Sequence, residues 1–336
     1  MKQYTSLYFV GAGGIGMSAL VRYFLAKGYK VAGYDRTQSP LTTELKAEGL
    51  EIVYEESVES IPDYCRNPET TLVVYTPAIP ASHAGLVYFR EHGFRVVKRA
   101  ELLGLITQSS KGLCFAGTHG KTTTSSMAAH IFHESPIGCN AFLGGILRNY
   151  NSNLILSEQS PFTVIEADEY DRSFHWLHPY MAVVTATDPD HLDIYGTEEA
   201  YLESFAHFTS LIQPGGCLIM KKGIRLVPNV KEGVKIYTYS ARDGGDFHAG
   251  NIRIGDGTIV FDFVMPEGSV ADIELGVPVE INIENAVAAM AIAWLNGVSG
   301  DNLRRAMASF KGAKRRFEFW VKRPDRVMID DYAHPP

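Results

Sequence analysis

The sequence lacks long apolar runs and clusters of basic residues. None of its apolar stretches approaches the roughly 20 residues that a membrane-spanning helix needs, so we expect no membrane segment. Lys2 stands near the N-terminus, but no long apolar core follows it, which argues against a secretory signal. The formal net charge is only −7 and no run of Lys and Arg occurs, which makes nucleic acid an unfavourable partner.

Cysteine is scarce as well. The four cysteines, Cys65, Cys114, Cys139 and Cys217, lie far apart and form no C-x-x-C motif. We therefore expect reduced thiols in a cytoplasmic protein, buried as small hydrophobic side chains. Apolar residues make up 46% of the 336 residues, which is enough for ordinary cores, and the length favours two or three domains. The sequence gives no indication of the oligomeric state.

Short apolar runs alternate with helical stretches in the first third of the chain. This alternation is typical of a parallel sheet covered on both faces, so the predicted fold class is α/β. The predicted strands and helices span residues 7–10, 17–27, 30–34, 71–75, 83–92 and 95–97. A short polar segment at 108–112 predicts a domain boundary, with a Rossmann-like domain at 1–108, a P-loop α/β domain at 109–329, and the start of a linker at 330–336.

The second unit begins with the same alternation of predicted strands and helices, and then its sequence pattern changes. Between residues 217 and 275 the apolar runs are broken by Gly, Asp and Pro, which predicts an added antiparallel patch. A final strand is predicted at 326–329. The other predicted strands and helices of this unit span 113–116, 122–133, 163–166, 181–185, 197–212, 283–295 and 300–310.

The first glycine-rich segment is Gly11-Ala12-Gly13-Gly14-Ile15-Gly16. It fits G-x-G-x-x-G between a predicted strand and a predicted helix, and Asp35 follows Gly16 by 19 residues. Its glycines let the backbone approach a pyrophosphate at the helix N-terminus, and Asp35 can accept a hydrogen bond from a ribose hydroxyl. This segment recognises a pyrophosphate and a ribose, so a dinucleotide and a UDP-sugar both fit it.

The second glycine-rich segment is Gly117-Thr118-His119-Gly120-Lys121-Thr122, also between a strand and a helix. Gly120 lets backbone N–H groups turn toward a phosphate. Lys121 supplies positive charge to the β- and γ-phosphates, and the Thr122 hydroxyl can reach magnesium. The helix dipole adds to this effect, and Thr123 offers a further hydroxyl. The segment predicts ATP binding.

Two phosphate-binding segments in one chain narrow the class of protein. A dehydrogenase needs only the first, and a simple ATPase needs only the second. A ligase that activates a nucleotide-linked acid needs both.

Two acidic clusters follow predicted strands of the second unit. Glu166-Ala167-Asp168-Glu169 ends the strand at 163–166, and Asp188-Pro189-Asp190-His191-Leu192-Asp193 follows the strand at 181–185. Carboxylates at the carboxyl edge of a parallel sheet face the ligand crevice, so one of them is expected to complete a magnesium shell with Thr122. His191 taken alone stays open between a structural histidine and a ligand, because magnesium prefers oxygen.

Together these residues resemble the Mur ligase family, ATP-dependent amino-acid ligases of peptidoglycan synthesis, and within it the branch that adds alanine. The resemblance extends over the whole chain. Beyond the two loops and the acidic clusters, three later segments resemble the family's adenine, phosphate and ribose motifs: Asn282-Ile283-Glu284-Asn285-Ala286, Arg315-Arg316-Phe317-Glu318 and Asp331-Tyr332-Ala333-His334-Pro335-Pro336.

The resemblance also implies roles for individual residues. Thr122 and Glu166 would bind magnesium, His191 would hold a second metal, Arg316 would reach the phosphates and Asp331 would touch the ribose. The expected catalytic group is then Lys121, Glu166, His191 and Arg316. The ATP site would add Gly117, Thr118, His119, Gly120, Thr123, Asn282 and Asn285, and the UDP-sugar would lie over the segment 11–16 and Asp35.

The implied reaction uses UDP-N-acetylmuramate, ATP and L-alanine. The γ-phosphate passes to the lactyl carboxylate, and the alanine amine attacks the acyl phosphate. The family pattern continues into a third domain that binds the amino acid, so we expect this chain to end at that junction and to be inactive alone. Ile281 stands where the family has a histidine before the first Asn of the adenine motif.

Two alternatives stay open at this stage. A recycling ligase that adds a whole tripeptide to the same sugar nucleotide shares both loops. A nicotinamide-dependent dehydrogenase would use the segment 11–16 with Asp35, although hydride transfer needs no second loop.

Overall fold

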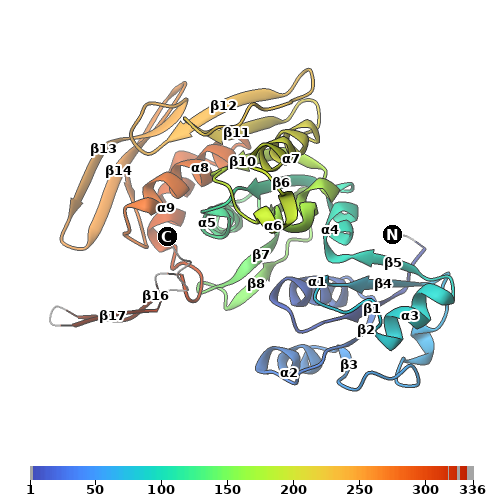
Figure 1. Cartoon of the computed structure of the whole chain (residues 1–336). Helices are drawn as coiled ribbons and strands as arrows, with labels where there is room; N and C mark the ends of the chain where they lie inside the picture. The colour runs from blue at the N-terminus through green and yellow to red at the C-terminus, as the bar shows by residue number, and fades with distance from the viewer. Residues whose placement is uncertain (1–2, 317, 324–325, 331–336) are drawn as a thin grey trace. The chain divides into compact units, whose positions relative to one another are not determined.

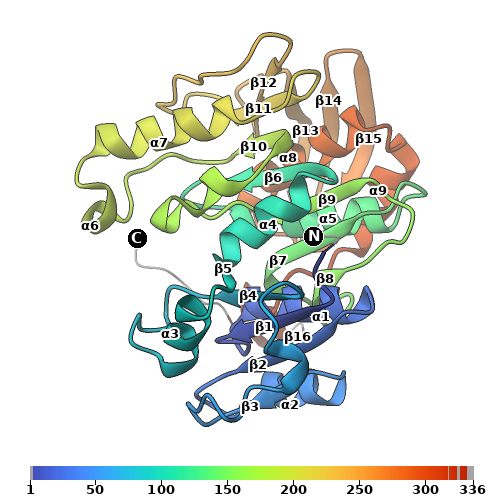
Figure 2. The same cartoon turned by 90° about the vertical axis from the view of Figure 1, so that its right-hand side faces the viewer.

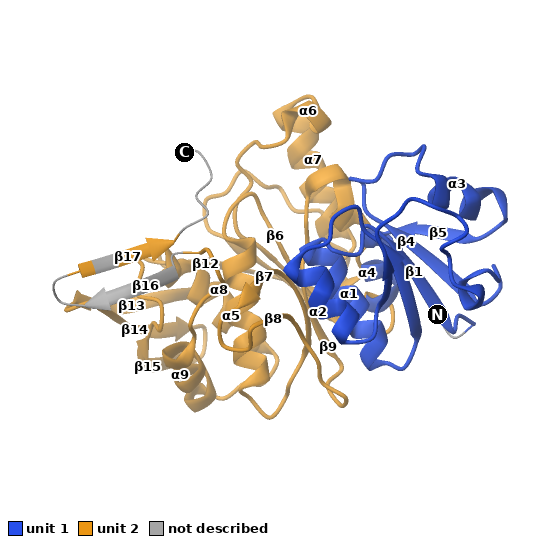
Figure 3. Ribbon diagram, turned by 90° about the horizontal axis from the view of Figure 1, so that it is seen from below, with its two compact units in different colours: residues 1–106 blue, residues 107–336 orange. Residues whose placement is uncertain are grey.

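The chain is described by a computed structural model that covers residues 3–316, 318–323 and 326–330 (Figure 1). It divides into two compact units, Met1–Ile106 and Thr107–Pro336 (Figure 3). Each unit is built on its own sheet with helices, which confirms the predicted α/β class.

Unit 1 is a parallel five-stranded sheet in the order β3-β2-β1-β4-β5. Apolar runs form its central strands, and every residue of β1 is buried. The chain runs outward from β1 to β3 and then returns to β4, so β1 and β4 flank the point where the strand order reverses, at which α/β sheets bind ligands. Its elements are β1 (Ser6–Val10), α1 (Ile15–Ala26), β2 (Lys30–Tyr34), α2 (Pro40–Ala47), β3 (Glu51–Val53), the 3₁₀ turn η1 (Asp63–Cys65), β4 (Thr71–Tyr75), α3 (Ala84–Glu91), β5 (Arg95–Lys98) and α4 (Arg99–Thr107).

Unit 2 is built on a ten-stranded mixed sheet in the order β15-β14-β13-β12-β11-β10-β6-β9-β7-β8. A separate hairpin, β16 (Glu318–Arg323) and β17 (Arg326–Asp330), follows it. The other elements are β6 (Lys111–Ala116), α5 (Lys121–His133), β7 (Asn140–Leu147), β8 (Ser152–Ile155), β9 (Phe162–Glu166), η2 (Tyr170–Trp176), β10 (Pro179–Val184), α6 (Leu192–Tyr195), α7 (Glu198–Ser210), β11 (Cys217–Lys221), β12 (Lys235–Ser240), β13 (Phe247–Gly255), β14 (Thr258–Met265), β15 (Gly268–Glu274), α8 (Ile281–Leu295) and α9 (Gly300–Ser309).

The predicted antiparallel patch begins later than expected. Between Cys217 and Leu275 we predicted an antiparallel patch, but β11 pairs parallel with β10, β12 with β11 and β13 with β12. Within this stretch the antiparallel pairs are β13–β14 and β14–β15. The reason lies in the connections. A parallel neighbour usually needs a crossover of about a dozen residues or more, and α7 before β11 and the long loop 222–234 before β12 supply it. The shorter connection to β13 allows parallel pairing with β12 at Tyr239 and Ser240.

The centre of unit 2 holds two helices side by side, α5 and α8 (Figures 1 and 2). Ten residues of α5 are buried, and α8 is buried along almost its whole length. Most of α8 is apolar, as expected of a helix in the interior of a protein, whereas α5 buries several Thr and Ser side chains as well. In the described part of the chain, no helix is both long and apolar enough to cross a bilayer. The packing fixes the direction of α5, whose first residue is Lys121.

A buried histidine ties α5 to α9. His130 Nδ1 lies 2.6 Å from the Tyr150 hydroxyl, and Nε2 lies 2.9 Å from Ser309 Oγ. Glu134 accepts from the same tyrosine at 3.0 Å. Burial lowers the pKa of His130 to about 4; Glu134 opposes this shift and His133 adds to it. The imidazole is therefore neutral in the folded chain at neutral pH.

Acid should destabilise unit 2 through His130. The folded-state pKa lies below the ordinary value of about 6.5, so the unfolded chain binds more protons between these pH values. Stability from this group is complete above about pH 6.5 and falls as pH drops toward 4, by about 3 kcal/mol. Urea unfolding between pH 7 and pH 4.5 measures this loss. His130→Gln, which does not titrate, should flatten the pH dependence, and equal losses in parent and variant would refute the assignment.

Candidate functional site

The second glycine-rich segment connects the carboxyl end of β6 to α5. Gly117 and Gly120 adopt φ values of 136° and 83°, in the left-handed region that glycine accepts without strain. A Cβ atom on Gly117 would overlap Oγ1 of Thr185, and one on Gly120 would lie 2.9 Å from Oδ1 of Asn285. Both glycines are therefore required by the backbone and by their neighbours.

Contacts from the chain after β10 hold this loop in shape. Thr185 Oγ1 donates to the His119 carbonyl at 2.5 Å, and the Thr118 amide donates to the Ala186 carbonyl at 3.1 Å. The Thr118 hydroxyl donates to the Asp188 carbonyl at 2.7 Å. The loop is thus preformed at the N-terminus of a buried helix, where backbone N–H groups and the helix dipole favour an anion.

Lys121 lies at the first position of α5 with its side chain mostly buried. Its ammonium donates to the Gly117 carbonyl at 2.6 Å and to Glu169 Oε1 at 2.8 Å. Glu169 is 1% exposed. Burial raises the pKa of the Glu169 carboxyl, and the Lys121 charge opposes that shift. The lysine charge is therefore held inside the loop by a buried carboxylate.

Thr122 and Glu166 meet next to this lysine. The Thr122 hydroxyl donates to Glu166 Oε1 at 3.0 Å, and the Gly144 amide, at 3.2 Å, donates to Glu166 Oε2. Burial raises the pKa of Glu166, and Lys121 opposes the shift. The expectation that the strand ending at Glu166 lies in the same sheet as the P-loop strand is confirmed, and β9 in fact pairs directly with β6, which brings Glu166 opposite Phe115.

This pair of oxygen atoms fits a magnesium ion. Magnesium is usually held by one or two protein oxygens, with phosphate and water completing its shell. In the described residues, no group of three or more His, Cys, Asp and Glu side chains is arranged to hold a metal ion. The protein would therefore contribute only a few of the ligands of such an ion, here Thr122 and Glu166.

His191 lies in the loop after β10, which neighbours β6 on the other side. It is the N-cap of α6 with a φ of 53°, and its amide donates to Asp190 at 2.7 Å. Its ring makes an edge contact with Tyr170, with 5.2 Å between centroids. These contacts place His191 at the expected edge of the sheet, and its role as a metal ligand stays a prediction.

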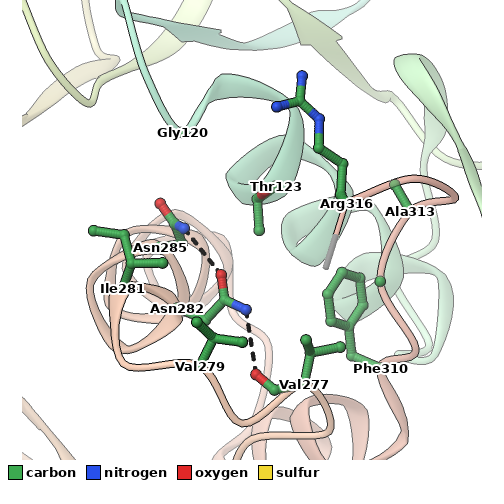
Figure 4. A pocket seen from close by; sticks show the side chains of 11 residues that line it. Gly120, Thr123, Val277, Val279, Ile281, Asn282, Asn285, Phe310, Ala313 and Arg316 are labelled. Carbon is green, nitrogen blue, oxygen red and sulfur yellow. Dashed lines mark hydrogen bonds between the residues drawn. The ribbon is translucent and has the colours of Figure 1, made fainter. Parts of the chain in front are cut away.

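A cavity of about 220 Å³ lies beside the loop (Figure 4). Asn282 and Asn285 lie on one side and Phe310 and Arg316 on the other (Figure 4). Its wall combines apolar side chains with a few polar ones, which suits a flat aromatic base that also carries hydrogen-bonding groups. The lining residues are Gly120, Thr123, Val277, Val279, Ile281, Asn282, Asn285, Phe310, Gly312, Ala313 and Arg316.

The two asparagines connect the cavity to the P-loop helix. Asn282 donates to the Val277 carbonyl at 3.2 Å and accepts from Asn285 at 3.1 Å. Thr124 of α5 donates to Asn285 Oδ1 at 3.1 Å. The expected adenine motif and the expected phosphate loop therefore form one connected site, which Ile281 also lines with 62% of its surface exposed. Asp331 lies outside the described residues.

In unit 1, the turn at 11–16 lies after β1, and Gly14 is the N-cap of α1. Asp35 Oδ2 accepts from the Gly13 amide at 2.7 Å, and Oδ1 accepts from the Thr37 amide at 3.0 Å. Asp35 thus braces the turn in addition to any role toward a ribose. Ile15, the first residue of α1, is 44% exposed.

Arg99 is a candidate that the sequence analysis missed. A Cβ atom on Gly16 would lie 2.8 Å from Nη1 of Arg99, so this guanidinium lies over the glycine turn. The signal was available, because Arg99 follows a predicted strand whose carboxyl end reaches the same edge of the sheet. The structure adds two more residues, Glu169 beside Lys121 and Gly144 beside Glu166. No spacing rule in the sequence identifies these two.

Both units of the chain match models of one known family. Residues 6–111 match the family model described as Mur ligase family, catalytic domain, and residues 115–293 match the Mur ligase middle domain. The chain belongs to the Mur ligase family.

Its relatives include one particular enzyme repeatedly. A UDP-N-acetylmuramate–L-alanine ligase from Parabacteroides distasonis is 66% identical to this chain over 336 residues, which are 100% of this chain and 73% of that ligase. Among solved structures, the UDP-N-acetylmuramate–alanine ligase from Thermotoga maritima matches 98% of this chain and 74% of its own, with a TM-score of 0.83 and 25% identity. A murein peptide ligase from Psychrobacter arcticus matches 98% of this chain and 73% of its own, with a TM-score of 0.78 and 25% identity.

Proposed function

We propose that this chain supplies the nucleotide sites of an ATP-dependent ligase that joins L-alanine to the lactyl carboxylate of UDP-N-acetylmuramate. The observation that carries the proposal is the buried Lys121 beside the Thr122–Glu166 pair, at the N-terminus of α5 and next to a cavity lined by apolar and polar side chains. The relative at 66% identity is a UDP-N-acetylmuramate–L-alanine ligase, which supports the choice of alanine. Because the proposed reaction consumes ATP, we place it in the cytoplasm.

ATP would lie with its base in the cavity and its phosphates over the segment 117–122. Asn282, Asn285 and Ile281 would contact the adenosine from one side. Lys121 would place its charge beside the β- and γ-phosphates, and Arg316 would approach them from the opposite wall. Backbone amides of the preformed loop would complete the anion site.

Magnesium would be held by Thr122 and Glu166, and His191 is the candidate for a second metal. When bound, the ion would neutralise charge on the transferring phosphoryl group. The role of the protein is to hold Glu166 in place: the Gly144 amide and the Thr122 hydroxyl each fix one carboxylate oxygen. This arrangement keeps the acceptor oxygens pointed at the loop.

Unit 1 would hold the UDP part of the second substrate. The turn at 11–16 offers backbone N–H groups at the start of α1, and Arg99 adds a positive charge over Gly16. Together they suit a pyrophosphate. The hydrogen bonds from the Gly13 and Thr37 amides leave lone pairs on the Asp35 carboxylate for a ribose hydroxyl.

The reaction then has two steps. The lactyl carboxylate oxygen attacks the γ-phosphorus, the bond to the β-phosphate oxygen breaks and ADP leaves with the electron pair. The neutral amine of alanine then attacks the acyl carbonyl, phosphate leaves, and the amine loses a proton. Positioning and charge neutralisation dominate phosphoryl transfer, and Lys121 and Arg316 supply both.

The test combines binding and turnover. Mg-ATP and UDP-N-acetylmuramate should each raise the melting temperature of this chain, because a ligand at about 100 times its dissociation constant stabilises by about 2.7 kcal/mol. The complete gene product that contains these residues should release phosphate from ATP only when UDP-N-acetylmuramate and L-alanine are both present.

Two other outcomes would redirect the proposal. Turnover with a murein tripeptide and none with L-alanine would indicate the recycling ligase. Tight binding of NADH to unit 1 without binding of the UDP-sugar would reverse the interpretation of Asp35 and its glycine turn.

A further inference from the structure

The ion pair between Lys121 and Glu169 is unusual in its burial. The lysine side chain is 14% exposed and the glutamate side chain 2%, with 2.8 Å between Nζ and either carboxylate oxygen. Exposed ion pairs contribute little to stability, but a buried one fixes two charges that are costly to separate. Oε2 has no partner with hydrogen-bond geometry, so the carboxylate contacts the ammonium mainly through Oε1.

The backbone that carries Glu169 is held rigidly. The Tyr195 hydroxyl donates to the Glu169 carbonyl at 2.5 Å. Two residues further along, Asp171 and Arg172 both have left-handed φ values, 51° and 53°, which cost free energy in residues other than glycine. The Arg172 guanidinium lies 4.8 Å from the centre of the Tyr195 ring. This segment therefore holds the Glu169 carboxylate at one place relative to α5.

The hydrogen bonds of Lys121 then define a direction. An ammonium group has three N–H donors and no acceptor. One donates to the Gly117 carbonyl and one to Glu169, which leaves the third for a ligand in the loop. Two fixed bonds stop the ammonium from turning or from following a phosphate oxygen out of the loop.

We propose that Glu169 is a positioning residue that orients the Lys121 ammonium for phosphoryl transfer and competes with the nucleotide phosphates for its charge. The proposal rests on the ATP site of the proposed function. It predicts two opposite effects. The buried Glu169 carboxylate repels the negatively charged triphosphate and competes with it for the Lys121 ammonium, so Glu169 weakens the binding of ATP. The same carboxylate fixes the cation where charge develops, so it speeds turnover.

The experiment uses Glu169→Gln, which keeps the size of the side chain and one acceptor but removes the charge. We expect the dissociation constant of Mg-ATP to fall by about tenfold and turnover of the complete gene product to fall by about 10- to 100-fold. AMP, which lacks the β- and γ-phosphates, should bind the parent and the variant equally. Isothermal titration calorimetry and phosphate release measure these changes.

A matched control removes a carboxylate at the C-terminal end of α5, the helix that begins with Lys121. Glu134 follows α5 and accepts a hydrogen bond from Tyr150, so Glu134→Gln makes the same change in net charge far from the loop. It should leave the affinity for Mg-ATP and the turnover unchanged. Glu169→Asp keeps the charge but is shorter by one methylene, and should recover part of the turnover.

The outcomes separate the two proposals. Weaker binding of ATP and AMP alike in Glu169→Gln would mean that Glu169 only supports the fold, and would overturn the inference while leaving the ATP site intact. If Glu169→Gln does not fold, a Glu169→Asp variant with turnover as low as that of an alanine variant overturns it equally. A parent chain that binds no Mg-ATP would overturn the proposed function itself, and the inference with it.

Discussion

Alanine in place of Lys121 should abolish the stabilisation by Mg-ATP and lower phosphate release by at least about 10²- to 10³-fold, the usual loss when one donor to a developing charge is removed. The reason is the position of this ammonium at the start of α5, inside a loop whose carbonyl and carboxylate neighbours fix it. Thermal shift with saturating Mg-ATP measures the first effect, and a coupled phosphate assay on the complete gene product measures the second.

The same substitution should destabilise the chain without ligand. It leaves the Glu169 carboxylate buried and unpaired, and breaking a buried ion pair costs about 3–5 kcal/mol. The double variant Lys121→Ala, Glu169→Gln removes that unpaired charge, so it should recover stability without recovering ATP binding. Lys221, which lies 2.8 Å from Glu284 in a more exposed pair, provides the control, because Lys221→Ala removes an ion pair outside the loop. Wild-type turnover in Lys121→Ala would exclude the phosphate site proposed here.

Alanine in place of Gly144 should have the second large effect, a loss of magnesium-dependent turnover by about 100-fold. A Cβ atom at this position would overlap Oε2 of Glu166. Glu166 has a flexible side chain, so it would shift at small cost in stability and lose its bond from the Gly144 amide. We therefore expect a nearly unchanged melting temperature without ligand and a raised magnesium requirement, measured by titrating Mg²⁺ at fixed ATP.

The neighbouring glycine offers a close control. A Cβ atom on Gly145 would lie 3.3 Å from Ala313 Cβ and 3.4 Å from Thr122 Cγ2, which small shifts accommodate. Gly145→Ala should therefore keep most of the activity. Equal losses in both variants would show that strand β7 tolerates no side chain here for reasons unrelated to Glu166.

Much of the fold was predictable because its signals are local. The strands at 30–34 and 71–75 are found at those residues, and the helix predicted at 122–133 starts one residue earlier, at Lys121. Apolar runs bounded by glycine carry this information within a few residues. The order of the sheet was less accessible. The parallel pairing of β11 and β12 depends on how residues 185–216 and 222–234 cross the sheet, and composition does not encode that path.

The candidate site likewise has some residues that the sequence predicts and others that it does not. The lysine and threonine of the loop stand in a recognisable pattern, and the adjacency of Glu166 follows from parallel pairing of β6 and β9. The choice of Glu169 as the partner of Lys121 does not follow from the sequence. Four consecutive positions, 166–169, carry three carboxylates. Only the Glu169 carboxylate pairs with the Lys121 ammonium among the ion pairs of the described residues, and the backbone just after it is left-handed at Asp171 and Arg172. Arg99 follows a predicted strand, but its position over Gly16, 83 residues earlier, depends on the order of β1, β4 and β5 in the sheet.

The strand order β10-β6-β9 also determines when the nucleotide site can exist during folding. Phe115 pairs with Glu166, and Ala116 pairs with Val184, so the loop and its acidic neighbours come from segments about 50 and 70 residues apart. Closing such long loops is slow and cooperative. A chain in which β9 or β10 has not yet paired with β6 does not hold Lys121, Glu166 and Thr185 together, so the proposed ATP site requires these strands to be paired. The nucleotide would then slow unfolding and proteolysis without speeding the search for the native topology.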